Sequence, residues 1–200
     1  LTPGGPYARW ALGASVDRLG GERTPIHALG FMFERSVVTA HDRLCATPAA
    51  TVTPRCARLR ASGLAAADTL VRLAATSTAG TIPTDARGPQ AKTIIDSLMN
   101  LGLLTWATRV SGDPRYTALA TRHARRVRDL LLRPDGSTFQ VAVHDRATGT
   151  LLHLGTRQGL TDESTWSRGQ AWAIDGFASI GRSIKDPELV GAAERAAESW

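Results

Sequence analysis

The sequence predicts an all-α protein made of stacked helical hairpins, with one small β-hairpin inserted among them. Apolar side chains recur at helical spacing in several long segments. The order helix, Asp-Pro, helix occurs twice, at Asp113-Pro114 and at Asp186-Pro187. Residues 138–153 instead alternate with the period of a strand. Helical hairpins that repeat along a chain share their cores with their neighbours, so we expect a stacked array.

The elements follow in order along the chain. Residues 1–26 are punctuated by Gly and Pro and predict a loop with one short helix at 8–19. The remaining pattern predicts about six helices, or three hairpins, at 29–44, 57–78, 94–110, 114–132, 166–182 and 187–200. Loops are expected at 46–54 and 80–92, and a loop as long as the second is more often functional than idle.

The β-hairpin is predicted around 138–153. One set of side chains, Phe139, Val141 and Val143, alternates with a second set, Thr138, Gln140 and Ala142. The stretch DRATGT then supplies the turn.

Length and composition limit the possible classes of protein. Two hundred residues fit one domain or part of a larger one. The chain begins at Leu1 and stops at Trp200 within a helical pattern, so we expect a fragment. Apolar residues make up 42% of the chain, and no apolar run is long enough to span a bilayer. No secretory signal pattern is visible, which favours a cytoplasmic location.

The net charge of +6 favours anionic partners such as acidic sugars, nucleic acid or anionic lipid. Arg carries nearly all of the positive charge, and its planar fork suits carboxylate and sulfate. The stretch RHARRVR in the helix at 114–132 predicts a solvated face, with nucleic-acid binding as the minor alternative. Cys45 and Cys56 indicate neither a metal site nor a disulfide framework, which favours a reducing compartment.

A cluster of aromatic and polar side chains opens the helix at 166–182. Trp166, Arg168 and Trp172 lie in the stretch STWSRGQAW, beside the unpaired amides and positive dipole of the helix start. Indole faces are surfaces on which sugar rings stack. Thr156 and Gln158 enter the same loop region, so the cluster predicts a pocket for an anionic sugar. The alternative is that the tryptophans are core residues and Arg168 forms a surface ion pair.

A lone acid lies in the stretch TIIDSLMNLG. Asp96 and Asn100 share one helix face, and their neighbours are apolar. Asn100 is therefore a candidate substrate contact beside the acid. A carboxyl group partly shielded from water has a raised pKa and can serve as a general acid. The alternative is a helix cap, with Thr93 as the rival capping residue.

These stretches together resemble the unsaturated glucuronyl hydrolases of glycoside hydrolase family 88. The matching pieces, from about residue 25 to the end, are HALGFMF, IIDSLMNLGLLTWA, GDPRYTALATRHA, DGSTFQVAVHD and QGLTDESTWSRGQAWAIDGFA. The first 24 residues match poorly. The resemblance implies a single partial (α/α)6 barrel domain over residues 1–200, without a metal or an organic cofactor.

The resemblance also implies a reaction. The family removes an unsaturated uronic acid from the non-reducing end of oligosaccharides that polysaccharide lyases leave. A carboxylic acid protonates C4 of the double bond, water captures the cation at C5, and the hemiketal falls apart. Asp96 matches the general acid/base. Gln158, Trp166, Arg168 and Trp172 match substrate contacts. His27, a further candidate for substrate binding, matches the histidine of the family's His-Asp pair.

Three positions depart from the family pattern. Ala28 stands where the family has a second aspartate, Gln140 where a histidine is frequent, and Arg157 where HQG is usual. Losing one carboxylate of a pair removes a charge that steadies the cation, which costs about 10²–10³ in rate. The resemblance and these departures together imply an impaired or vestigial member of the family, or one piece of an intact enzyme.

Two other readings remain from the sequence alone. The first is a non-catalytic relic that binds acidic glycans, and the second is a hydrolase of unsaturated rhamnogalacturonyl units. The expected partners are unsaturated uronic-acid oligosaccharides, with no membrane and no nucleic acid. The sequence makes no prediction of the oligomeric state.

Overall fold

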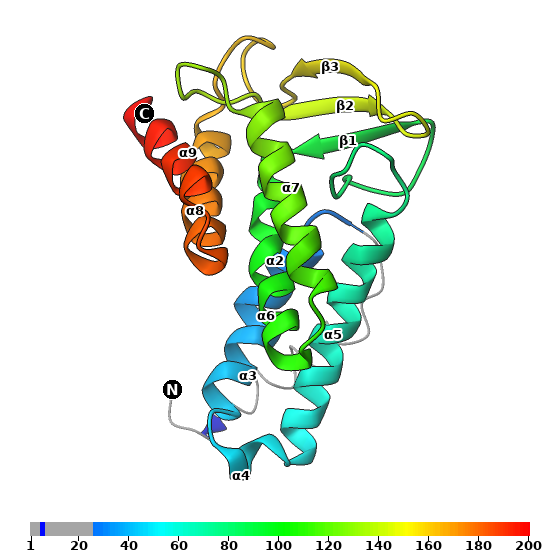
Figure 1. Cartoon of the computed structure of the whole chain (residues 1–200), viewed down its shortest axis with the longest axis vertical. Helices are drawn as coiled ribbons and strands as arrows, with labels where there is room; N and C mark the ends of the chain where they lie inside the picture. The colour runs from blue at the N-terminus through cyan, green and yellow to red at the C-terminus, as the bar shows by residue number, and fades with distance from the viewer. Residues whose placement is uncertain (1–4, 7–25) are drawn as a thin grey trace.

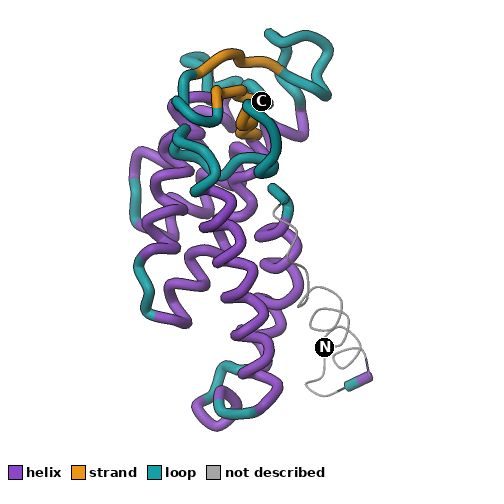
Figure 2. Tube along the Cα trace, turned by 90° about the vertical axis from the view of Figure 1, so that its right-hand side faces the viewer, coloured by secondary structure: helices purple, strands orange, loops and turns teal. Residues whose placement is uncertain are grey.

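The computed structural model describes residues 5–6 and 26–200, and the helix expected at 8–19 lies outside them. The described residues form a body of packed helices with a small sheet at one end (Figures 1 and 2). Their six longer helical segments pair into three hairpins, as the sequence predicts. The bounds are α2 (Leu29–Phe33), π-helical η2 (Glu34–Val38) and α3 (Thr39–Leu44), which run on as one helix, then α4 (Pro48–Thr51), α5 (Pro54–Ala74), α6 (Leu101–Ser111), α7 (Arg115–Leu131), α8 (Ser167–Ile184) and α9 (Pro187–Glu198).

Local chemistry explains where the second and third hairpins turn. Helix α6 ends at Gly112, whose φ of 78° is open to glycine without a steric penalty. Helix α9 begins after Asp186, whose carboxylate accepts hydrogen bonds from the amides of Glu188 and Leu189 while Pro187 fills the first helical position. The Asp-Pro pattern therefore marked both helix starts.

The sheet is larger than the sequence predicted. Strands β2 (Val141–Asp145) and β3 (Leu151–Gly155) form the expected hairpin, but a third strand, β1 (Gln90–Ile94), pairs antiparallel with β2. Six residues of 3-10 helix, η3 (Ile95–Asn100), then join β1 to α6. The helix expected at 94–110 is therefore a strand end, a tight turn and a helix. The run of apolar residues in this segment is compatible with a strand, a turn or a helix, so the pattern alone did not separate them.

The buried face of β2 is the more polar one. Gln140 just before the strand, then Ala142 and His144 within it, are 5%, 0% and 0% exposed, because this face lies against the helices. The predicted alternation therefore has the right period, and the set that contains Thr138, Gln140 and Ala142 faces the protein interior.

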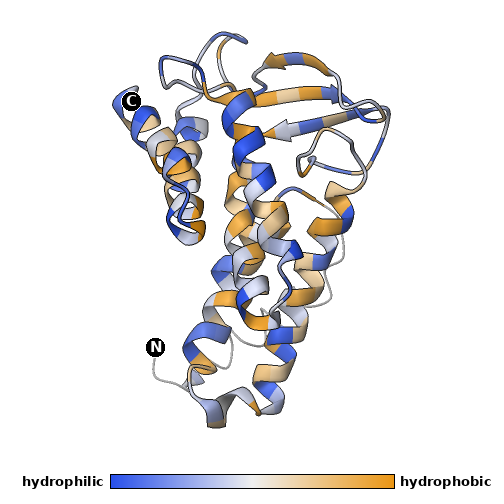
Figure 3. Ribbon diagram, viewed as in Figure 1, coloured by the Kyte–Doolittle hydropathy of each residue, from blue (hydrophilic) through white to orange (hydrophobic). Residues whose placement is uncertain are grey.

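The core runs along the faces that the helices share. Apolar positions of α5 and α6 appear as orange bands in Figure 3, and members such as Leu59, Leu70 and Leu104 are fully buried. Helix α5 comes close to α6 at Gly63, where an added Cβ would lie 2.5 Å from the Trp106 ring. Only glycine fits at that crossing without moving the indole.

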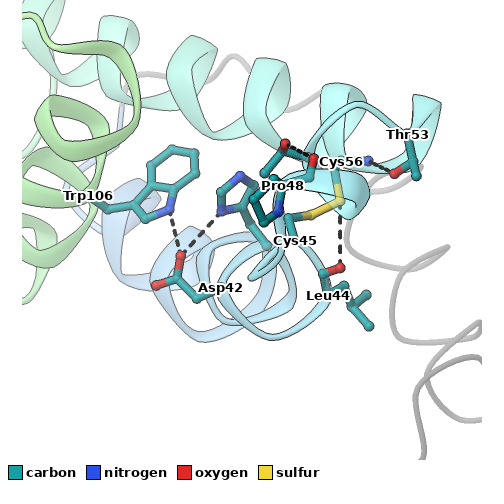
Figure 4. Close-up of a disulfide and its surroundings, with 9 residues drawn as sticks. Asp42, Leu44, Cys45, Pro48, Thr53, Cys56 and Trp106 are labelled. Atoms are coloured by element: carbon teal, nitrogen blue, oxygen red, sulfur yellow. Dashed lines mark hydrogen bonds and ion pairs between the residues drawn. A yellow bond between two sulfur atoms is a disulfide. The ribbon is translucent and has the colours of Figure 1, made fainter.

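The expectation for the two cysteines is wrong, because Cys45 and Cys56 form a disulfide (Figure 4). Cys45 follows the end of α3 and Cys56 lies in the first turn of α5, so the short α4 connection brings them together. Beside them, Asp42 accepts a hydrogen bond from Trp106 Nε1 at 3.2 Å and forms an ion pair with Arg109 at 2.7 Å. The end of the first hairpin is thus fastened to α6 as well.

Removing this disulfide is expected to destabilise the protein by about 3 kcal/mol, since the bond closes a short loop and limits the unfolded chain. The double variant Cys45→Ser/Cys56→Ser should therefore unfold at a lower urea concentration than the oxidised protein. Oxidised and reduced wild type provide the matched comparison, and equal midpoints for all three would contradict the prediction.

The basic face of α7 binds other parts of the same chain. Arg125 pairs with Asp186 at 2.8 Å, and Arg128 pairs with Glu188 at 2.7 Å, so both join α7 to α9. His123, in the same RHARRVR stretch, is fully buried. These contacts favour an intramolecular role for this stretch over nucleic-acid binding. No helix in the described part of the chain is long and apolar enough to cross a bilayer.

Candidate active site

A cavity of about 110 Å³ lies where η3, α8 and the start of α2 meet. Four of the residues that the sequence singled out line it, and three apolar side chains complete the wall. The lining residues are His27, Asp96, Arg168 and Trp172 together with Ala28, Phe31 and Met99. Residues from three separate stretches of the chain therefore converge on one small space.

Asp96 is the acid of this cavity. Burial raises its pKa, while its own backbone amide and the positive charges of His27 and Arg168 lower it in part. Its Oδ2 atom is buried, with no hydrogen-bond partner among the described residues. An unpaired buried carboxyl oxygen favours the protonated form, because ionisation would leave a charge without compensation.

The cation and the indoles come from the beginning of α8. The Arg168 guanidinium lies over the Trp166 ring, 4.4 Å from its centroid, which holds the arginine at the cavity. Trp172 meets Phe31 edge to face with centroids 5.5 Å apart, and its Nε1–H is buried without a partner in the described structure. Among the residues that line the cavity with Asp96, Trp172 therefore has an unpaired indole N–H and Arg168 has a positive charge.

Trp166 does not line this cavity but lies next to it. An added Cβ on Gly169 would be 2.8 Å from the Trp166 ring and 3.2 Å from Ile95 Cγ2. The indole, the α8 backbone and the residue before Asp96 are therefore packed together.

Asn100 is not at the cavity surface. It is fully buried, and its Oδ1 accepts hydrogen bonds from the amides of Gly30 at 2.9 Å and Phe31 at 3.3 Å. Its Nδ2 donates to the carbonyls of His27 and Ser97. These amides are orphan donors of the first turn of α2, so Asn100 caps that helix from a distance and fixes His27.

Thr156 and Gln158 lie in a separate loop. We call residues 156–159 the Gln140 loop, because the side chain of Gln140 accepts hydrogen bonds from Thr156 Oγ1 and from the amides of Arg157 and Gln158. Gln158 is exposed and Thr156 half-buried. The main chain links Gln140 to the residue before Asp96, since the Gln140 carbonyl accepts a hydrogen bond from the Ile95 amide at 2.9 Å.

His123, which the sequence pattern placed on the solvated face, is buried and binds the turn that contains Asp96. Its Nδ1 accepts a hydrogen bond from the Ile82 amide at 2.9 Å, so its Nε2 carries the proton and donates to Ser97 Oγ at 2.9 Å. Ser97 in turn donates to the Ile94 carbonyl. This chain of hydrogen bonds holds both sides of the turn that presents Asp96. The sequence gave no signal of this role, because His123 is a lone histidine in an arginine-rich stretch.

Burial lowers the pKa of His123 to about 3. The imidazole remains neutral in the folded state, whereas it gains a proton near pH 6.5 when unfolded. Its stabilising contribution is therefore complete above pH 6.5 and is lost as the pH falls toward 3. Urea titrations over this range should show declining stability in wild type and a weaker decline in His123→Gln. A decline of equal slope in both proteins would contradict the assignment.

The described residues contain no group of three or more His, Cys, Asp and Glu placed to hold a metal ion. The groups at the cavity are instead those of proton transfer and of recognition of an anionic ring. The stacked helical hairpins that carry this site have the α/α-barrel fold of the solved proteins that the chain resembles.

Comparison with known proteins shows what the chain resembles. No family model matches the chain. The unsaturated glucuronyl hydrolase of Bacillus sp. strain GL1 is 44% identical over 107 residues, which are 54% of this chain and 28% of that protein. The unsaturated chondroitin disaccharide hydrolase of Streptococcus pyogenes serotype M1 is 40% identical over 97 residues, 48% of this chain and 24% of its own length.

Solved structures extend the likeness over nearly all of the chain. An unsaturated glucuronyl hydrolase variant with dGlcA-Glc-Rha-Glc aligns with a TM-score of 0.80 and 35% identity, over 96% of this chain and 49% of that one. An unsaturated glucuronyl hydrolase specific for heparin gives 0.77 and 30%, over 90% and 46%. The resemblance to the unsaturated glucuronyl hydrolases is therefore confirmed. The chain spans about half the length of these solved enzymes and about a quarter of the curated relatives.

Proposed function

We propose that the protein is a glycoside hydrolase that removes unsaturated uronic acid from the non-reducing end of lyase-generated oligosaccharides. The observation that carries the proposal is the half-buried carboxyl of Asp96, whose pKa is raised and whose Oδ2 is buried without a partner among the described residues, in one cavity with Arg168 and Trp172. The unsaturated uronide has a vinyl ether for an acid to protonate and a carboxylate for a cation to bind.

The proposed reaction begins with proton transfer from Asp96 to C4 of the double bond. Positive charge then develops at C5 and is shared with the ring oxygen. Water adds at C5, and the proton that it loses returns to the Asp96 carboxylate. The hemiketal opens and releases the rest of the oligosaccharide, so Asp96 ends the cycle protonated.

The substrate contacts are divided between the two parts of the site. In this proposal Arg168 binds the uronate carboxylate and Trp172 stacks against the ring or donates from Nε1. His27 and the Trp166 ring orient these groups, while Thr156 and Gln158 meet the sugar from the Gln140 loop. Asn100 supports the site without touching substrate.

Unsaturated glycosaminoglycan disaccharides are the substrates to test first, because relatives act on glucuronyl and chondroitin disaccharide units. The same relatives favour this class over unsaturated rhamnogalacturonyl units. The conjugated double bond absorbs in the ultraviolet, and hydration removes that absorbance. We expect wild-type protein to remove it. Unchanged absorbance at high protein concentration would contradict the proposal.

Ala28 favours a second candidate function, a binding protein for acidic glycans without turnover. Its methyl group lines the cavity at the position where the resembling family has a carboxylate. Tryptophan fluorescence separates the two functions, since Trp172 lies in the cavity. Saturable quenching by the disaccharide with no loss of its absorbance would indicate the binding protein.

The cytoplasmic location stays a prediction. The Cys45–Cys56 disulfide favours an oxidising compartment, because cytosolic thiols are kept reduced. Alkylation of protein taken directly from its native cells would show in which redox state the pair exists.

A further inference from the structure

Gln140 uses all of its polar atoms and is only 5% exposed. Its amide donates to the Gly155 carbonyl at 3.0 Å, and its carbonyl accepts from the Ile95 amide at 2.9 Å. The main chain of this single residue therefore joins the end of β3 to the turn that carries Asp96.

The side chain of Gln140 binds three successive residues of the loop beyond β3. Its Oε1 accepts from Thr156 Oγ1 at 2.8 Å, from the Arg157 amide at 2.7 Å and from the Gln158 amide at 3.0 Å. Its Nε2 donates to Gln158 Oε1 at 2.7 Å. Two of the three donors are main-chain amides, so the atom facing them must be the oxygen.

We propose that Gln140 is a positioning residue that sets the Gln140 loop at a fixed place relative to Asp96. The inference rests on the proposed function, since it assigns the loop to substrate binding. A buried carboxamide can accept several hydrogen bonds on one side and donate on the other. A hydroxyl group lacks the reach, and an imidazole has only one acceptor nitrogen.

The proposal distinguishes binding from chemistry. Gln140 contacts the loop and not the cavity, so its loss should weaken substrate binding more than proton transfer. For Gln140→Leu we expect KM to rise about ten-fold with a smaller fall in kcat. Glu at this position keeps an oxygen for the same three donors, and Gln158 can turn its carboxamide to donate. Gln140→Glu should therefore restore KM to near the wild-type value.

Hydrogen exchange of the Arg157 and Gln158 amides tests the proposal without any turnover. Both should exchange about ten-fold faster in Gln140→Leu and at the wild-type rate in Gln140→Glu. Gln170→Leu is the matched control, because Gln170 is 1% exposed and bonds Thr138, Gly136 and Ala196 instead of this loop. It should leave these two amides unchanged.

The two proposals fail in different ways. If wild type does not consume the disaccharide, the proposed function fails, and fluorescence titration of disaccharide binding replaces KM. If the two amides exchange alike in wild type and Gln140→Leu, the positioning role is overturned. It is also overturned if they exchange faster while substrate affinity stays the same.

Discussion

Asp96→Asn is expected to reduce hydration of unsaturated uronides by about 10²–10⁴-fold, because the variant lacks the proton that the double bond must receive. The amide has nearly the same shape as the carboxyl group, so the cavity and its affinity for disaccharide should persist. Loss of ultraviolet absorbance measures turnover, and tryptophan fluorescence measures binding. Turnover at the wild-type rate in Asp96→Asn would exclude this residue as the acid.

The pH dependence of turnover gives a second check on the same residue. The proton donor must be protonated, so turnover should fall as pH rises through the raised pKa of Asp96. An acid with an ordinary pKa near 3.8 would already be ionised well below neutral pH. Asp135→Asn is a suitable control, because the Asp135 carboxylate is exposed, accepts hydrogen bonds from Ser137 and does not line the cavity. Its pH profile should match that of wild type.

Asp96 should also make stability depend on pH. The folded-state pKa is raised, so the folded protein keeps a proton that the unfolded chain loses above about pH 3.8. The contribution of Asp96 to stability is therefore complete below that pH and is lost as pH rises through the raised value. Asp96→Asn should be more stable than wild type at neutral pH and nearly equal at low pH. A constant difference would show that the carboxyl is not buried as the structure has it.

Most helices follow from the sequence, because apolar spacing and Asp-Pro starts are local signals. Strand β1 does not, since Gln90–Ile94 becomes a strand only by pairing with β2, whose residues lie about fifty positions later. The inward face of β2 is likewise decided by what packs on it. The Cys45–Cys56 disulfide depends on how α3 and α5 meet, which residue spacing alone does not reveal.

In the candidate site, too, local features could be predicted from the sequence and tertiary contacts could not. The sequence singled out Asp96, Arg168 and Trp172 because their residue types are unusual where they stand. The family resemblance put them in one site, and they line one cavity. It misjudged Asn100, since a buried helix cap and a substrate contact have the same composition and spacing. It also missed the role of His123, whose partners Ile82 and Ser97 are brought to it by tertiary packing.

Ala28→Asp is the second change with a large expected effect, an increase in turnover of about 10²–10³-fold. A carboxylate at this position would lie at the cavity wall and stabilise the positive charge that develops at C5. The cavity of about 110 Å³ has room for the added group. Ala28→Asn is the matched control, because it has the same size without the charge and should give little or no gain.

The new carboxylate should remain available to the cavity. Ala28 occupies the N-cap position of α2, where an aspartate ordinarily turns back to bind the first amides of the helix. Here the amides of Gly30 and Phe31 are already bound by Asn100 Oδ1. A negative charge beside Asp96 should also raise the pKa of Asp96 further, which would move the alkaline limb of the pH profile upward. Gain of turnover with that shift would show that Ala28 is what limits the enzyme. Binding of disaccharide without any gain would show that the chain has lost more than one carboxylate, and would favour the glycan-binding function.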